Sequence, residues 1–309
     1  MRAGLPSALV ALVAAFGPAP ASAQAPPTTR PPVVIETEVD IVSITAVIHD
    51  KAGRFAAGLG PKDIHVFEDG VEQQVTIFRE AQGGEEKIPL SVGLVLDASG
   101  SMAQSIGFLK EAASSFVGKL EEEVDEALIV QFNDSVKGSA EFTGDIDRLD
   151  QFIAGLQAWG GTSLYDAIRY SLDRIKDRPG RKALVVFSDG DDTTSTLSES
   201  EVVDYARSVE ATIYSIGIRG GPGGGGPPRG FLKRIAEETG GQYFFPDKVG
   251  ELIRVFAAIS VELHRHYLLA YSPKKAPDGL FRKIEVRLDR KDLEVRVRKG
   301  YFAIKRRRR

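Results

Sequence analysis

The sequence contains no cysteine, a single tryptophan and only two methionines among its 309 residues. The absence of cysteine excludes thiol nucleophiles, disulfide bonds and thiolate-bound metal ions. An excess of one charge is also missing, because 40 lysines and arginines nearly balance 43 aspartates and glutamates and leave a formal net charge of -3. Such a chain has no global basic surface for nucleic acid, so its partners must be inferred from a local site.

The N-terminal residues have the order of features typical of a secretory signal. Arg2 precedes the apolar run Ala8–Phe16, and the small residues Ala21, Ser22 and Ala23 follow. The run is too short to span a bilayer, and no other stretch approaches transmembrane length. We therefore predict a signal peptide over residues 1–23, with an uncleaved membrane anchor as the alternative. The mature protein is expected in the periplasm, on the cell surface or outside the cell.

Residues 24–32 contain four prolines and are predicted to form an extended linker. The remaining chain is long enough, at 42% apolar composition overall, for one full core and a second, smaller domain.

Two β-rich segments flank the middle of the chain, residues 33–88 and residues 267–309. Their apolar residues occur in short or alternating runs, which indicate strands: Val39–Ile48, Ile64–Phe67, Val71–Phe78, Tyr267–Tyr271, Ile284–Leu288 and Leu293–Val297. Neither flank is long enough to bury a stable core alone. We predict that the two flanks pair into one small β-sandwich, with packing of the C-terminal strands on the central helices as the alternative.

Residues 89–266 alternate between apolar strands and amphipathic helices. The predicted strands are Leu90–Leu96, Ala127–Phe132, Ala183–Phe187, Thr212–Ile218 and Gln242–Phe245, and the predicted helices cover Met102–Leu120, Ile146–Leu156, Leu164–Ile175, Val203–Val209, Leu232–Ala236 and Leu252–Leu263. A capping box at Ser198 and Glu201 marks the start of the fourth helix. Fully apolar strands alternating with helices predict an α/β fold: a doubly wound, mostly parallel, Rossmann-like sheet with helices on both faces.

Polar residues gather where this sheet is expected to bind ligands. Asp97, Ser99 and Ser101 follow the first predicted strand, Asp189 follows the third, and Thr162 precedes a helix. The carboxyl ends of parallel strands meet at one edge of a sheet, so these three loops are expected to meet. Their hydroxyl and carboxylate oxygens suit a hard cation, Mg²⁺ or Mn²⁺. The alternative for the serines is capping of a helix N-terminus.

The pattern Asp97-x-Ser99-x-Ser101, Thr162 and Asp189-Gly190 resembles the metal-ion-dependent adhesion site of the von Willebrand factor type A (vWA) family. The resemblance implies that the serines and the threonine bind Mg²⁺ directly and that the aspartates bind it partly through water. It also implies that an Asp or Glu of a partner protein completes the metal coordination.

The flanks have a wider resemblance. They are similar to exported vWA-related proteins common in acidobacteria, in the following residues: His49–Gly53, Gly58, Leu59, Asp63, Glu68–Gly70, Phe78, Tyr267–Ser272 and Arg298–Phe302.

These features favour a non-enzymatic protein-binding or adhesion module. A scaffold for an envelope complex is the alternative among binding proteins. A Mg²⁺-dependent hydrolase is the enzymatic alternative, and Asp192 is the one candidate for its general base. Trp159 is either a contact residue beside the metal or part of the core.

Three further features receive no firm role. The tract Gly220–Gly230 is either a rim of the site or inert, because it lacks the ending of a phosphate-binding loop. No carboxylate partner is suggested for His264 or His266. The basic run Lys305–Arg309 either touches anionic lipid or polysaccharide, or is solvated.

Overall fold

The computed structural model describes residues 41–81, 88–138, 141–189, 191–218 and 229–304. All of these belong to one compact unit, Val39–Arg309. The predicted signal peptide, the Pro-rich linker, most of the Gly/Pro-rich tract and the basic run lie outside the described residues.

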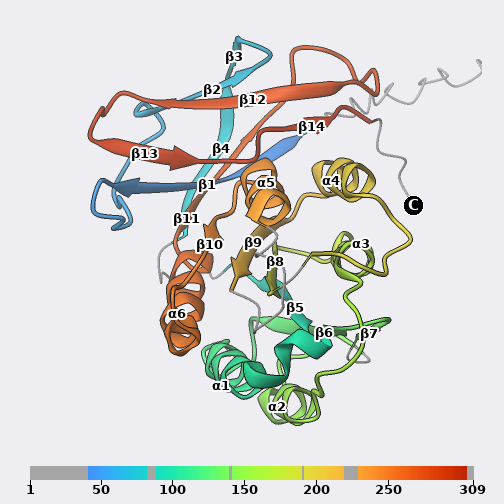
Figure 1. Cartoon of the computed structure of the whole chain (residues 1–309). Helices are drawn as coiled ribbons and strands as arrows, with labels where there is room; N and C mark the ends of the chain where they lie inside the picture. The colour runs from blue at the N-terminus through green and yellow to red at the C-terminus, as the bar shows by residue number, and fades with distance from the viewer. Residues whose placement is uncertain (1–40, 82–87, 139–140, 190, 219–228, 305–309) are drawn as a thin grey trace, which may run out of the picture. The chain divides into compact units, whose positions relative to one another are not determined.

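The middle of the chain forms a six-stranded sheet, in which five strands are parallel and one edge strand is antiparallel (Figure 1). In sheet order the strands are β10 (Tyr243–Phe244), β9 (Thr212–Gly217), β8 (Arg181–Ser188), β5 (Leu90–Asp97), β6 (Glu126–Phe132) and the antiparallel β7 (Val136–Gly138). All eight residues of β5 are buried, as expected for a central strand covered on both faces. The predicted doubly wound α/β fold is confirmed.

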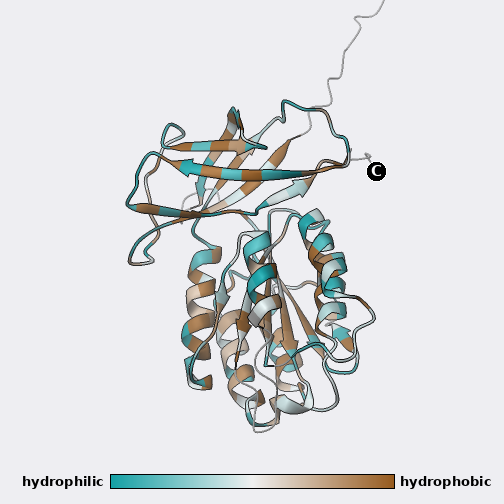
Figure 2. Ribbon diagram, turned by 45° about the horizontal axis from the view of Figure 1, so that its top comes forward, coloured by the Kyte–Doolittle hydropathy of each residue, from teal (hydrophilic) through white to brown (hydrophobic). Residues whose placement is uncertain are grey.

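Helices cover both faces of this sheet (Figures 1 and 2). One apolar core contains α1 (Ile106–Val117), α2 (Ile146–Ala154) and α6 (Leu252–Leu263), and the other contains α3 (Leu164–Ile175), α4 (Glu199–Ser208) and α5 (Arg229–Thr239). The capping box of Ser198 and Glu201 begins α4 as predicted. The predicted helix Met102–Leu120 is interrupted, because a 3-10 turn, η1 (Gly100–Gln104), precedes α1.

The two flanks form two four-stranded sheets around a shared apolar core. One sheet has the order β13 (Leu293–Arg296), β1 (Val42–Asp50), β11 (His266–Tyr271), β4 (Val75–Ala81), and the other has the order β14 (Gly300–Phe302), β12 (Phe281–Leu288), β2 (Ile64–Glu68), β3 (Val71–Gln73). Both sheets combine strands from the two flanks, so the flanks pair with each other as predicted. The prediction of one strand over Val71–Phe78 is wrong. The structure has two strands there, β3 and β4, and they belong to different sheets.

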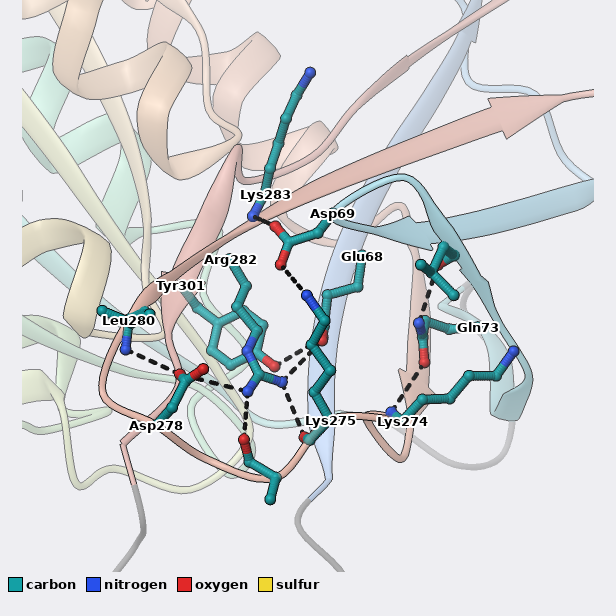
Figure 3. Close-up of polar contacts among 12 residues, drawn as sticks. Glu68, Asp69, Gln73, Lys274, Lys275, Asp278, Leu280, Arg282, Lys283 and Tyr301 are labelled. Atoms are coloured by element: carbon teal, nitrogen blue, oxygen red, sulfur yellow. Dashed lines mark hydrogen bonds and ion pairs between the residues drawn. The ribbon is translucent and has the colours of Figure 1, made fainter.

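A buried ion pair lies within the sandwich (Figure 3). The guanidinium of Arg282 lies 2.9 Å from Glu68 Oε1, and each side chain is only 2% exposed. The hydroxyls of Tyr271 and Tyr301 donate to Glu68 Oε2 at 2.7 and 2.8 Å. Arg282 also donates to the backbone carbonyls of Lys275 and Ala276, so the ion pair fixes the loop that leads into β12.

His264 follows α6 and has a carboxylate partner that the sequence analysis did not anticipate. Its Nε2 lies 3.0 Å from Asp125 Oδ2. Asp125 also accepts hydrogen bonds from the backbone amides of Leu90 and Glu121, at 3.2 and 3.1 Å, so it joins the end of α6 to the start of β5. The hydrogen bond to Asp125 raises the pKa of His264. Burial alone would raise the pKa of Asp125, but its hydrogen bonds outweigh burial and lower it.

Replacing His264 with Gln is expected to reduce stability more at about pH 6 than at about pH 9. Because the pKa of His264 is raised in the folded protein, its stabilisation is complete below the unfolded value of 6.5 and is lost as the pH rises through the folded value. The loss at the lower pH should be about 1 kcal/mol or less, since a third of the side chain is exposed and solvent screens the pair. Urea unfolding of the wild type and of His264→Gln at the two pH values measures the loss of stability. Equal losses at both pH values would contradict the pairing of His264 with Asp125.

Among the described residues, no helix combines the length and the apolar composition that crossing a membrane requires.

Candidate metal site at the carboxyl edge of the sheet

The site begins where β5 and β8 end. These strands are adjacent and parallel, with Leu96 opposite Phe187, so the residues that follow them emerge at the same edge of the sheet. Asp97 is fully buried there. Its Oδ2 accepts a hydrogen bond from Ser188 Oγ at 2.6 Å, and its Oδ1 accepts one from the amide of Ser99 at 2.8 Å. The carboxylate is therefore held by the last residue of β8 and by the loop that follows β5.

A chain of polar contacts continues from this carboxylate to Asp189. The hydroxyls of Ser99 and Ser101 lie 3.0 Å apart, and Ser101 Oγ donates to Asp189 Oδ1 at 2.7 Å. The other oxygen, Asp189 Oδ2, is buried and has no hydrogen-bond partner among the described residues. Leaving such an oxygen unpaired costs free energy, and sites that receive a ligand or ion tolerate this cost.

Thr162 lies on the loop before α3, and backbone hydrogen bonds hold this loop against the loop that follows β5. The amide of Trp159 donates to Ala98 O at 3.0 Å, and the amide of Gly100 donates to Gly160 O at 2.9 Å. Thr162 itself is buried. The structure thus links four of the predicted residues by hydrogen bonds and holds the fifth on a loop that is bonded to theirs.

The two carboxylates lie in a poorly solvated environment. Burial raises the pKa of Asp97 to about 6, with a further contribution from the charge of Asp189. Burial also raises the pKa of Asp189. Desolvation disfavours the charged form of a carboxyl group, and a nearby cation reverses this effect.

The donor set fits a hard cation. It consists of three hydroxyls and two carboxylates, and oxygen ligands of this kind suit Mg²⁺ or Mn²⁺. The described residues contain no group of three or more His, Cys, Asp or Glu side chains placed to hold a metal. A cation at this edge would therefore depend on the serine and threonine hydroxyls, and the unpaired Asp189 Oδ2 is an oxygen available to it.

Several supporting residues were not predicted from the sequence. Ser188 orients Asp97, as described above. Asp134 Oδ1 accepts a hydrogen bond from the amide of Gly161 at 2.5 Å. Gly160 has a φ of +73°, and a Cβ there would lie 2.3 Å from Asp134 Oδ2, so the paired glycines allow the loop of Thr162 to approach this carboxylate. In the sequence, the Gly160-Gly161 pair was the one sign that this loop lies close to another side chain.

The structure shows the surroundings of Trp159 and Asp192, for which the sequence left alternative roles open. Trp159 is 49% exposed, so it is not part of the core. Asp192 accepts hydrogen bonds from the amides of Tyr165 and Ser195 and from the Ser195 hydroxyl. These contacts tie the loop after β8 to the start of α3, so the carboxylate of Asp192 has a supporting role.

The fold and the site define an α/β domain whose polar, oxygen-rich edge lies at the carboxyl ends of parallel strands. The family model of the von Willebrand factor type A domain matches residues 91–257, more than half of the sequence, and the chain belongs to this family. No curated protein matches the chain in sequence.

Solved structures are similar in fold. A von Willebrand factor type A protein from Catenulispora acidiphila is 14% identical, with a TM-score of 0.51, and the match covers 87% of this chain and 64% of that one. An aerotolerance-related membrane protein from Bacteroides fragilis is 20% identical over 56% of this chain and 98% of its own, with a TM-score of 0.47. The von Willebrand factor domain of a type V pilus tip protein from Porphyromonas gingivalis is 12% identical over 56% and 94%, with a TM-score of 0.45.

Proposed function

We propose that this protein is an exported, non-enzymatic binding module that holds Mg²⁺ or Mn²⁺ and uses it to engage an acidic residue of a partner protein. The proposed ligands are Asp97, Ser99, Ser101, Thr162 and Asp189. The observation that supports this most directly is the buried, unpaired Asp189 Oδ2 beside two serine hydroxyls. Export rests on the signal-like sequence of residues 1–23.

A bound divalent cation supplies positive charge and an open position that an incoming carboxylate can occupy. The hydroxyls of Ser99, Ser101 and Thr162 would bind it directly, and because they are neutral they would leave much of its charge for the partner. Asp97 is held in place by Ser188 and by the Ser99 amide, so its carboxylate would orient the first loop. Trp159 is exposed, and its amide donates to Ala98 O in the first loop, so its side chain would contact a partner bound at the cation.

The arrangement favours binding over hydrolysis. A hydrolase would need a general base beside the site, and the candidate Asp192 is instead engaged by Tyr165 and Ser195. Assembly of an envelope complex would use the same contact to an acidic residue, and it remains the alternative among binding functions.

The experiment is affinity capture from envelope and secreted fractions of the producing cell. The mature chain from Gln24 is used with Mg²⁺, with EDTA, and as the Asp97→Ala variant. EDTA and Asp97→Ala should each reduce the captured partner at least about tenfold, which corresponds to about 1.4 kcal/mol. The control is Asp177→Ala. Asp177 is an exposed carboxylate that precedes β8, at the amino ends of the strands and away from the candidate site, so this variant should capture as well as the wild type.

Equal capture in all four arms would exclude the metal-dependent mechanism. A single retained protein would support an adhesion-type contact, and a multicomponent assembly retained in the same metal-dependent manner would support the scaffold alternative.

A further inference from the structure

A cavity of about 250 Å³ lies at the amino ends of β8 and β9, at the edge of the sheet opposite the candidate metal site. Its lining includes Arg181 and Thr212, the first residues of these strands, and Ser43 and Thr45 of β1. Ser43 and Thr45 flank the core residue Ile44 in an alternating strand, so their side chains lie on the outer face of the sandwich. Since a water molecule takes about 30 Å³ in the liquid, the cavity has room for several waters or for one small molecule.

The charged side chains that line this cavity are mostly positive. Among the described residues they are Arg181, Lys182 and Arg298, against one carboxylate, that of Glu210. His266 also lines the cavity, but burial lowers its pKa to about 2, so its ring is uncharged at neutral pH. Three cations against one carboxylate leave the lining with two positive charges that are not compensated within it.

Arg181 is a buried cation, because only 5% of the residue is exposed. Its guanidinium contacts neutral groups: it donates to the backbone carbonyls of Glu262 and Leu263, to Nδ1 of His266 at 2.8 Å and to the hydroxyl of Tyr214 at 3.2 Å. Its Nε is buried and has no hydrogen-bond partner in the part of the chain that the structure describes. A buried charge is costly unless a group of opposite charge accompanies it, so the surroundings of Arg181 favour an anion.

The neighbouring carboxylate of Glu262 does not supply this negative charge. It accepts a hydrogen bond from the Tyr214 hydroxyl at 2.6 Å, and its ion-pair partner is Arg296. Lys182, which follows Arg181 in β8, has its ammonium 3.4 Å from the backbone carbonyl of Arg178. Within the described ranges, neither cation at the start of β8 has an ion pair with a carboxylate.

We propose that this cavity binds a phosphate group, either as free phosphate or as the monoester of a small alcohol. A phosphate monoester carries a charge of about -1.5 to -2 at neutral pH, which matches the excess charge of the lining. Arg181 and Lys182 attract the phosphate, and the hydroxyls of Ser43 and Thr45 are donors for its oxygens. A monocarboxylate would leave one positive charge uncompensated. This site is separate from the metal edge and does not depend on the proposed function.

Isothermal titration calorimetry of the mature chain tests the proposal, with free phosphate, glycerol phosphate and acetate as probes. EDTA is present throughout, so that no probe can bind through a cation at the metal edge. At least one of the two phosphates should bind at least about tenfold more tightly than acetate, a difference of about 1.4 kcal/mol. Tighter binding of glycerol phosphate would identify an ester as the ligand, and tighter binding of free phosphate would identify the free ion.

Two variants should change phosphate binding in opposite directions. Lys182→Gln removes an attracting charge and should weaken binding about tenfold, whereas Glu210→Gln removes a repelling charge and should strengthen it severalfold. Damage to the fold does not account for stronger binding, so the second variant separates electrostatic attraction from a structural role. Circular dichroism should show that both variants are folded.

Lys62→Gln is the matched control, because Lys62 is an exposed lysine before β2 and outside the cavity lining. It removes the same charge as Lys182→Gln and should bind phosphate as the wild type does. No binding of either phosphate at about 10 mM, which is weaker than about 3 kcal/mol, would overturn the proposal. So would equally tight binding of acetate, or equal losses in Lys62→Gln and Lys182→Gln.

Discussion

Replacing Arg282 with Met is expected to lower the free energy of unfolding by about 3–5 kcal/mol. The substitution leaves the carboxylate of Glu68 buried, and in the part of the chain that the structure describes, its remaining side-chain partners are the hydroxyls of Tyr271 and Tyr301. It also removes the donors that hold the carbonyls of Lys275 and Ala276. Burying a charge without its counterion is far more costly than losing one hydrogen bond, so this should be among the most damaging single substitutions in the sandwich. Urea unfolding followed by circular dichroism measures it.

A double variant separates the buried charge from loss of packing. Glu68→Gln combined with Arg282→Met removes both charges, while the Gln oxygen can still accept from the tyrosine hydroxyls. It should be more stable than Arg282→Met alone, which is the non-additive result expected of a coupled pair. The matched surface control is Arg290→Met, which breaks the exposed ion pair with Asp292 and should not measurably change stability. A double variant no more stable than Arg282→Met alone would show that packing, not charge, is what Arg282 contributes.

The sequence predicts the larger elements because local patterns determine them. Continuous apolar strands such as Leu90–Leu96 have to be buried on both faces, so a parallel sheet with two helical layers is the consistent fold. The pairing of the flanks followed from their shortness, since neither could bury a core alone. The division of Val71–Phe78 into β3 and β4 was not predictable from alternation, because both halves are β-like and only the partner strands differ.

The relative positions of the candidate site residues were predictable to a similar extent. Asp97, Ser99 and Asp189 could be brought together because each follows a strand end, and strand ends meet at one edge. The contacts of Asp134 with Gly161 and of His264 with Asp125 were missed because they join residues 27 and 139 positions apart. Local periodicity carries no information about such partners, whose approach depends on how loops pack after the sheet has formed.

Mg²⁺ is expected to raise the thermal unfolding temperature of the wild type and to leave that of Asp189→Ala unchanged. A ligand that binds only the folded state stabilises it by about 2.7 kcal/mol at a hundredfold excess over its dissociation constant. For a chain of this length, that corresponds to a rise of about 5 °C. The physical basis is the unpaired Asp189 Oδ2, which the cation would compensate, and EDTA should reverse the shift. Differential scanning calorimetry with and without Mg²⁺ measures it.

Asp191→Ala is the matched control, because this exposed carboxylate lies two residues away and its loss changes the local charge equally. If Mg²⁺ acts at the proposed site, Asp191→Ala keeps the shift and Asp189→Ala loses it. If Mg²⁺ merely screens the acidic loop, both variants lose the same part of the temperature shift, and the proposed ligand set is wrong.

Without metal, Asp189→Ala should be no less stable than the wild type. The substitution removes a buried oxygen, Oδ2, that has no hydrogen bond to lose, and it leaves exposed Ser101 free to bond to water. A strongly destabilised metal-free variant would instead assign Asp189 a structural role, with Ser101 as its essential partner.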